Sequence, residues 1–149
     1  MSTSVLIIGE SGTGKSTSLR TLNPKETYII NVLNKPLPFK GWKNQYNINN
    51  ENTNYNVPEN HNKINAIMEK VSNERQNIKN IIVDDFQYVM CNEFMRRINE
   101  KGYDKWNEIA EHIWRILINA QEQRDDLTIF FLSHSERGED GKFRAKTVG

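Results

Sequence analysis

A glycine-rich segment between an apolar strand and a short helix constrains the fold of this chain more than any other feature. Residues 9–16 have the sequence G-E-S-G-T-G-K-S, which fits the pattern G-x-x-x-x-G-K-S without a mismatch. Residues 4–8 before it are apolar and rich in β-branched side chains, so we expect a strand buried on both faces. A helix is expected over residues 15–22, ending at Asn23-Pro24. This order is typical of a phosphate-binding loop at the start of a parallel α/β sheet.

Each residue type in this loop has a chemical reason. Gly9, Gly12 and Gly14 permit backbone angles that side chains would forbid, so successive N–H groups can point at phosphate oxygens. Lys15 is expected to reach the β and γ phosphates, and Ser16 to place its hydroxyl on Mg²⁺. The alternative is a glycine-rich turn without a function. The strand, the loop and the helix in register favour the phosphate-binding interpretation.

Apolar strands alternate with amphipathic helices along the chain. Strands are expected over residues 27–32, 79–85 and 127–133, which are short and apolar. A helix is expected over residues 61–75, where Asn60 can cap the first turn. The alternation predicts an α/β fold with a parallel sheet and helices on both faces.

Two further helices, separated by Gly102, carry apolar residues at helical spacing, which we expect to face the core. Two prolines make residues 35–42 a turn-rich connection, and Gly138 and Gly141 indicate a loop or hairpin later in the chain. We expect Trp42 to pack on its own domain, with stacking on a base as the alternative. The expected core positions of the two helices are Phe86, Met90, Phe94, Ile98, Trp106, Ile109, Ala110, Ile113, Ile116, Leu117 and Ala120.

The strand that ends in Asp84 has the pattern of the acidic partner of a phosphate-binding loop. Asp84 is predicted to hold Mg²⁺, directly or through water, although buried strands also end in aspartate as a helix cap. Asp85 is a candidate for orienting or deprotonating the attacking water, and a helix N-cap is its alternative role. Glu10 lies inside the loop and is a second candidate for facing the γ phosphate.

Two features near the C-terminus are further candidates. His134 follows the last apolar strand, at the edge of a parallel sheet where ligands bind, and is predicted to sense the γ phosphate. Lys142, Arg144 and Lys146 occupy alternate positions, so an extended chain would present all three on one face. They are candidates for binding nucleic-acid phosphates or for reaching a neighbouring subunit's nucleotide, with a solvated edge strand as the alternative. Lys15, Asp85 and His134 are the candidate catalytic residues.

Composition excludes several other classes of protein. A formal net charge of +1 argues against a strongly basic nucleic-acid coat or a polybasic membrane binder. The single cysteine, Cys91, excludes an intrachain disulfide framework and a cysteine-based zinc site. His61, His112 and His134 are scattered and lack the spacing of metal ligands. The apolar runs are too short to span a bilayer, so we expect no membrane association and a reducing cytoplasm.

Residues 34–37, N-K-P-L, bear on the choice of nucleotide. They are similar to the guanine-binding N-K-x-D of GTPases, but Leu37 stands where the aspartate belongs. They also precede Asp84, the reverse of the GTPase order, so we expect ATP rather than GTP. A small-molecule kinase would need an arginine-rich lid, for which Arg137 and Arg144 are a thin basis.

Five segments together resemble the short RecA-like, AAA-type P-loop ATPases of phages, which include the ATP-dependent single-strand annealing proteins of recombination. The resemblance covers essentially the whole chain. The phosphate loop is widely shared, whereas the combination of K-P-L-P-F, D-D-F-Q-Y and S-H-S-E is more specific. The segments are V-L-I-I-G-E-S-G-T-G-K-S-T-S-L-R, Y-I-I-N-V with K-P-L-P-F, I-I-V-D-D-F-Q-Y-V-M, Y-D-K-W-N-E-I-A and F-L-S-H-S-E.

This resemblance implies a RecA-like core, ATP with Mg²⁺, a homo-oligomeric ring or filament, and a role with single-stranded DNA in phage recombination or replication in the host cytoplasm. By matching position it assigns the metal to Ser16 and Asp84, and the strand-end sensor to His134. It also matches residues 135–147 to the DNA-contacting region of RecA-like proteins. The positions it assigns to ATP are Gly9, Glu10, Ser11, Gly12, Thr13, Gly14, Lys15, Ser16 and Thr17.

The chain departs from the family pattern in two ways. Members usually continue past residue 149 into further strands, so residues 1–149 are expected to form one ATPase domain whose sheet lacks its last strands. RecA proper places a catalytic glutamate after its second strand, where residues 31–35 contain no acid here. The water-activating residue is therefore unassigned. A non-hydrolysing nucleotide-dependent switch or scaffold and a small-molecule kinase are the alternative functions.

Overall fold

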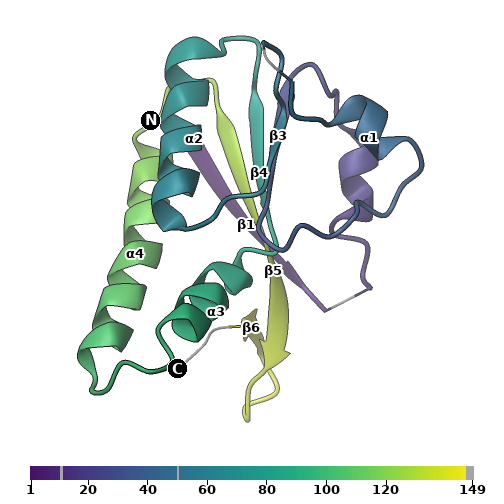
Figure 1. Cartoon of the computed structure of the whole chain (residues 1–149). Helices are drawn as coiled ribbons and strands as arrows, with labels where there is room; N and C mark the ends of the chain where they lie inside the picture. The colour runs from purple at the N-terminus through teal and green to yellow at the C-terminus, as the bar shows by residue number, and fades with distance from the viewer. Residues whose placement is uncertain (11, 50, 147–149) are drawn as a thin grey trace.

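A five-stranded parallel sheet forms the centre of the computed structural model, which describes residues 1–10, 12–49 and 51–146 (Figure 1). A sixth strand, β6, pairs antiparallel with the far end of β5. The spatial order is β1-β5-β4-β2-β3, so β5 lies between β1 and β4. The bounds are β1 (Thr3–Gly9), β2 (Thr27–Asn31), β3 (Tyr55–Asn56), β4 (Asn80–Asp84), β5 (Thr128–Arg137) and β6 (Phe143–Ala145).

The register of the strands brings their carboxyl ends to one edge. Gly9 at the end of β1 pairs with His134 in β5, and Asn31 at the end of β2 pairs with Asp84 at the end of β4. Parallel pairing requires this, because all five strands from β1 to β5 run in the same direction. The polar residues predicted from the sequence therefore follow strands that end side by side.

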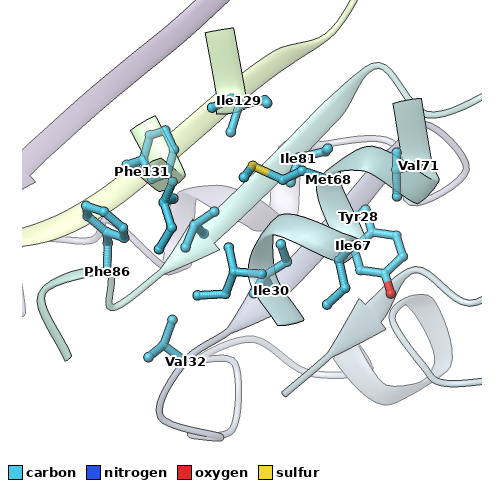
Figure 2. Close-up of a cluster of buried hydrophobic side chains, with 14 of the residues drawn as sticks. Tyr28, Ile30, Val32, Ile67, Met68, Val71, Ile81, Phe86, Ile129 and Phe131 are labelled. Carbon is cyan, nitrogen blue, oxygen red and sulfur yellow. The ribbon is translucent and has the colours of Figure 1, made fainter. Parts of the chain in front are cut away.

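Three helices cover one face of the sheet: α2 (His61–Glu74), α3 (Gln87–Arg96) and α4 (Asp104–Gln121) (Figure 1). Alternate residues of the central strands, such as Ile30, Ile81 and Phe131, pack against these helices (Figure 2). Met68 of α2 is fully buried among them. Burial of these apolar side chains stabilises this layer.

The other face has a thinner cover, made by the 3₁₀ helix η1 (Thr17–Thr21), the short helix α1 (Trp42–Gln45) and the connection around them. Ile29, Ile82 and Leu132, on the strand positions between those of the first face, pack against this layer. The ring of Trp42 lies 5.5 Å from that of Tyr55, which confirms that this tryptophan packs on its own domain. Both faces are covered, so the predicted α/β class with a flanked parallel sheet is confirmed.

The N-cap predicted for α2 is confirmed, whereas the predicted apolar stripes of α3 and α4 are buried only in part. The side chain of Asn60 accepts a hydrogen bond from the backbone N–H of Lys63, as expected for an N-cap. In α4, Ile109 and Ile116 are buried. The prediction that every apolar stripe position faces the core is wrong, because Ile98 is 49 % exposed and Leu117 is 37 % exposed. Ile98 follows the end of α3, and the packed face of α4 is narrower than its apolar stripe.

The prediction that the first strand is buried on both faces is wrong. Leu6 is 56 % exposed, and Ile7 and Ile8 are more than a third exposed. β1 stands at the edge of the described sheet, with β5 as its one strand neighbour there. Apolar composition therefore identified a strand correctly without specifying its position in the sheet.

The predicted helix over residues 15–22 is wrong in type and in length. The chain forms only the 3₁₀ helix η1 after the loop, and Leu22 is already extended. Ser18 and Thr21 donate side-chain hydrogen bonds to the carbonyls of Lys15 and Ser18, three residues before each. Serine and threonine compete in this way with regular α-helical bonding.

Within the described part of the chain, none of the helices has the length and apolarity that crossing a bilayer requires.

Candidate functional site

The glycine-rich loop has the backbone shape that its sequence predicts. Gly12 and Gly14 have φ values of +82° and +93°, in the left-handed region that favours glycine. At Gly9 the constraint is space, because a Cβ there would lie 2.8 Å from Oγ1 of Thr13. That hydroxyl in turn donates to the carbonyl of Glu10 at 2.7 Å. Ser11 lies outside the described residues.

Lys15 places its ammonium group inside this loop. Its Nζ donates to the carbonyl oxygens of Gly9 at 2.6 Å and Glu10 at 2.9 Å. Burial lowers the pKa of Lys15 from its ordinary value, while the carboxylates of Asp85 and Asp84 act in the opposite direction. The loop thus holds a cation at its centre, as binding of an anionic phosphate requires.

Ser16 and Asp84 meet although 68 residues separate them in the sequence. The Ser16 hydroxyl lies 3.1 Å and 3.0 Å from the two carboxylate oxygens of Asp84. Asp84 is only 4 % exposed, and burial together with the charge of Asp85 raises its pKa to about 6. The backbone N–H of Asp85 donates to the same carboxylate at 3.0 Å. The pKa is raised because the positive charge near Asp84 is too small to offset its burial and the repulsion from Asp85.

Asp85 is buried and adopts an unusual backbone conformation, with φ of +58°. Its alternative role as a side-chain N-cap is wrong, because Phe86 occupies the N-cap position of α3 without a side-chain cap bond. One carboxylate oxygen of Asp85 lies 3.4 Å from Nζ of Lys35, and the other lies 3.5 Å from Nε2 of His134. A strained conformation of this kind recurs at functional sites.

Sequence reasoning missed Lys35 as a member of this site. It considered the residue only as part of a GTPase-like motif. The usable signal was a lysine shortly after β2 and directly before a proline, at the carboxyl edge of the sheet. Lys35 contacts Asp85 because the connection after β2 turns back across this edge, where the side-chain amide of Asn31 donates to the carbonyl of Lys35 at 2.6 Å.

His134 lies at the site, as its strand-end position predicts. Burial and the charge of Lys15 lower its pKa, which favours the neutral imidazole near pH 7. Its backbone N–H donates to Oε1 of Gln87 at 3.2 Å. Gln87 is buried and its Nε2 has no hydrogen-bond partner among the described residues, so it is a second residue that sequence reasoning missed.

A cavity of about 190 Å³ collects these groups at the carboxyl edge of the sheet. Glu10 is exposed and outside its lining, so the structure does not place that side chain in the cavity. Asp84 lies behind Ser16 rather than on the cavity surface. The lining residues are Gly12, Gly14, Lys15, Ser16, Thr17, Lys35, Pro38, Asp85 and His134.

A larger cavity of about 870 Å³ lies at the opposite end of the sheet, near the starts of β2 and β4. Asparagine side chains make up much of its lining. Ligands of parallel α/β sheets bind at the carboxyl ends of the strands, and Asp84 and His134, whose pKa values are perturbed, lie there. The smaller cavity is therefore the candidate functional site.

The three cations of the tail lie outside this cavity but on an element that begins at it. Lys142, Arg144 and Lys146 are all exposed, and Arg144 pairs with Glu136 across the β5–β6 hairpin at 3.3 Å. The backbone N–H of Lys146 donates to the carbonyl of His134 at 2.8 Å. The predicted hairpin is confirmed, and one end of it is bonded to a residue of the site.

The residues present fit a nucleoside triphosphate with Mg²⁺. The loop provides a glycine cradle around a lysine ammonium, and hydroxyl and carboxylate oxygens are the ligand types that Mg²⁺ prefers. Two adjacent ligands of an octahedral Mg²⁺ lie about 2.9 Å apart. The 3.0 Å separation between Ser16 and Asp84 matches that spacing.

Comparison with known proteins supports this assignment. A family model described as an AAA domain matches residues 2–137, which include β1, the loop, β4 and β5. No curated protein matches the chain. The matched span contains every group that lines the cavity.

Proposed function

We propose that this chain, which belongs to the AAA-domain family, binds ATP with Mg²⁺ and hydrolyses it to ADP and phosphate. Membership in the family indicates a nucleotide-binding P-loop domain. The observation that carries the proposal is the contact between Ser16 and Asp84 beside the ammonium of Lys15. This arrangement offers two Mg²⁺ ligands next to a phosphate-binding loop.

Each group has a role in this proposal. The loop N–H groups and Lys15 bind the phosphates, while Ser16 and Asp84 hold the metal. Mg²⁺, when bound, neutralises charge that develops on the phosphate oxygens. Asp85 accepts the proton of the attacking water or orients it, and its contacts with Lys35 and His134 fix its carboxylate.

We further propose that the nucleotide controls binding of single-stranded DNA, in a homo-oligomeric ring or filament like those of the phage recombination ATPases that the sequence resembles. The support within this chain is the β5–β6 hairpin, which carries the three cations of the tail and in which the backbone N–H of Lys146 donates to the carbonyl of His134. A change at His134 can therefore reach Lys142, Arg144 and Lys146 through one hydrogen-bonded element.

A nucleotide-dependent switch that does not hydrolyse ATP is the second candidate, and one observation favours it. Asn31 stands at the end of β2, next to Asp84 in the register, where an acid would complete a catalytic site. This feature would retain nucleotide binding while slowing hydrolysis.

Steady-state phosphate release separates these functions. The wild-type chain is incubated with ATP and Mg²⁺, with and without single-stranded DNA, beside Lys15→Ala and the matched surface variant Lys25→Ala. We expect release from the wild type and from Lys25→Ala, and loss of release from Lys15→Ala, because only Lys15 lies in the loop. ATP binding without release would favour the switch, and equal release by all three proteins would refute the assigned site.

The DNA proposal has its own test. Replacement of Lys142, Arg144 and Lys146 by glutamine should reduce the dependence of single-stranded DNA affinity on salt. Removal of three phosphate contacts lowers the slope of log affinity against log salt by about 2. An unchanged slope would exclude the hairpin as the DNA-binding surface, and a mass measurement with ATP would test the oligomer.

A further inference from the structure

Three helices bring two histidines and a glutamate together on the face of the sheet that they cover. His61 is the first residue of α2, Glu93 lies in α3 and His112 lies in α4. Nδ1 of His112 is 2.8 Å from Oε1 of Glu93, and Nδ1 of His61 is 3.7 Å from the same oxygen. The two imidazole rings stack with centroids 3.7 Å apart. The expectation that the histidines are scattered is therefore wrong for two of the three.

This cluster has the donor atoms of a transition-metal site. Each of the three residues offers one ligand atom, and these atoms all lie within 4.8 Å of one another. Glu93 is only 6 % exposed, so its carboxylate is held in place by the packing around it. Two imidazole nitrogens and one carboxylate oxygen are a common ligand set for Zn²⁺, with the fourth position left to water.

We propose that His61, Glu93 and His112 form a Zn²⁺ site that joins α2, α3 and α4. The ion occupies the space around Oε1 of Glu93, which both imidazoles face. The two rings are nearly parallel in the stack, so binding of one ion by both nitrogens requires the imidazoles to turn out of this arrangement. This site is separate from the proposed ATP site and does not depend on it.

Arg97 is the main competitor for Glu93, and its position is compatible with the ion. Its Nη1 lies 2.9 Å from Oε2 of Glu93, which Nδ1 of His112 also approaches at 2.9 Å, whereas Nδ1 of His61 is recorded against Oε1. Arg97 also pairs with Glu100 and Glu108, so its charge is balanced within its own network. In this arrangement Arg97 orients the ligand carboxylate through its second oxygen, as outer partners of metal ligands commonly do.

The remaining charges near the cluster set a limit on its affinity. Arg96 and Arg115 both lower the pKa of His61, so their positive charges also oppose a cation. Glu111 pairs with Arg115 and offsets part of this effect. We therefore expect a dissociation constant in the micromolar range rather than the far tighter binding of a cysteine-based structural site.

Zinc titration of the full, tag-free chain tests the proposal, after removal of metals with a chelator. Calorimetry with Zn²⁺ alone should give one ion per chain, and Zn²⁺ should raise the melting temperature of the wild type but not that of the His61→Gln/His112→Gln double variant. His61→Gln and His112→Gln should each weaken binding at least tenfold, and the double variant should abolish it. Cys91→Ser is the matched control. Cysteine is a residue type that binds zinc and Cys91 lies in α3, but it is not part of the proposed site, so its removal should leave the affinity unchanged.

Two checks keep the result unambiguous. The melting temperatures of all variants in chelator show whether each one is folded. In the wild type, Zn²⁺ should shift the ¹⁵N imidazole signals of His61 and His112 but not those of His134. Failure of the wild type to bind one ion, or equal binding by the double variant, would overturn the proposal and leave the cluster as a hydrogen-bond network only.

Discussion

Two sites with buried carboxylates lie close together in the sequence, one just before α3 and one within it, and the charges around them differ. Before the helix, Asp84 and Asp85 lie next to each other, and burial with this repulsion raises the pKa of Asp84 to about 6. Within the helix, Glu93 is surrounded by His61, His112 and Arg97, and its pKa is lowered despite burial. At Asp84 the nearby charge of Lys35 is outweighed by burial and by Asp85, whereas at Glu93 the neighbouring histidine and arginine outweigh burial.

The donor atoms and the charge balance of the two sites suit different ions, as the two proposals require. Around Asp84 the additional ligand is the hydroxyl oxygen of Ser16, and oxygen ligands suit Mg²⁺. Around Glu93 the additional ligands are imidazole nitrogens, which suit Zn²⁺. The exposed fractions of the two side chains are similarly low, but Asp84 lies deeper in the protein, so burial and the neighbouring charges both contribute to the difference.

The largest expected effect is on catalysis. Asp84→Asn removes the charged metal ligand while keeping the shape of the side chain, so ATP hydrolysis should fall at least about 100-fold. Phosphate release at saturating ATP and Mg²⁺ measures the change, with Glu93→Gln as the comparison. Equal losses in the two variants would remove the distinction between a catalytic and a structural carboxylate.

The same substitution should stabilise the protein in the absence of nucleotide. A pKa raised in the folded state makes the carboxyl favour folding at low pH, and this contribution is lost as pH rises from 3.8 through about 6. The shift corresponds to about 3 kcal/mol at pH 8. Urea unfolding at pH 8 should therefore show Asp84→Asn to be more stable than the wild type, and the gain should vanish near pH 4.

Glu93→Gln should have the opposite sign. The pKa of Glu93 is lowered in the folded state, so its ionised form stabilises the protein at neutral pH, and this contribution is lost as pH falls through that lowered pKa. Loss of its charge-assisted bonds to His112 and Arg97 should cost about 1–3 kcal/mol. Urea unfolding at pH 8 measures it beside Asp84→Asn. Stabilisation by both substitutions would refute the charge comparison.

The smallest expected effect is the pH dependence of Mg²⁺-dependent ATP binding. Protonation of Asp84 below its pKa of about 6 removes a metal ligand. At pH 5 about a tenth of this carboxyl is ionised in the free protein, so affinity should be about tenfold weaker than at pH 7.5. The ATP affinity of Asp84→Asn should not depend on pH in this way. If its pH profile matched that of the wild type, a group other than Asp84 would cause the pH dependence.

The sequence predicted the parts of the site that are local. Gly12, Gly14 and Lys15 lie in one short motif, and their backbone conformations follow from residue type. The positions of Asp84 and His134 followed from a general rule, since both come where an apolar run reaches the carboxyl edge of a parallel sheet, although β5 itself continues to Arg137. Their roles stay predictions, although the structure brings them to one edge.

The parts that could not be predicted depend on tertiary packing. The exposure of Leu6 follows from the edge position of β1, and strand order is not encoded within the strand itself. Lys35 reaches Asp85 through an irregular connection without a periodic signal. His61 and His112 meet because α2 and α4 pack together, and their sequence separation gives no indication of it.

Calorimetric titration of ATP into the wild-type chain and into Lys15→Ala, each with Mg²⁺ and with chelator, tests the central claim most directly. The account predicts one ATP per wild-type chain, much weaker binding without Mg²⁺, and no measurable binding to a folded Lys15→Ala. Binding of ATP by Lys15→Ala with wild-type affinity would contradict it.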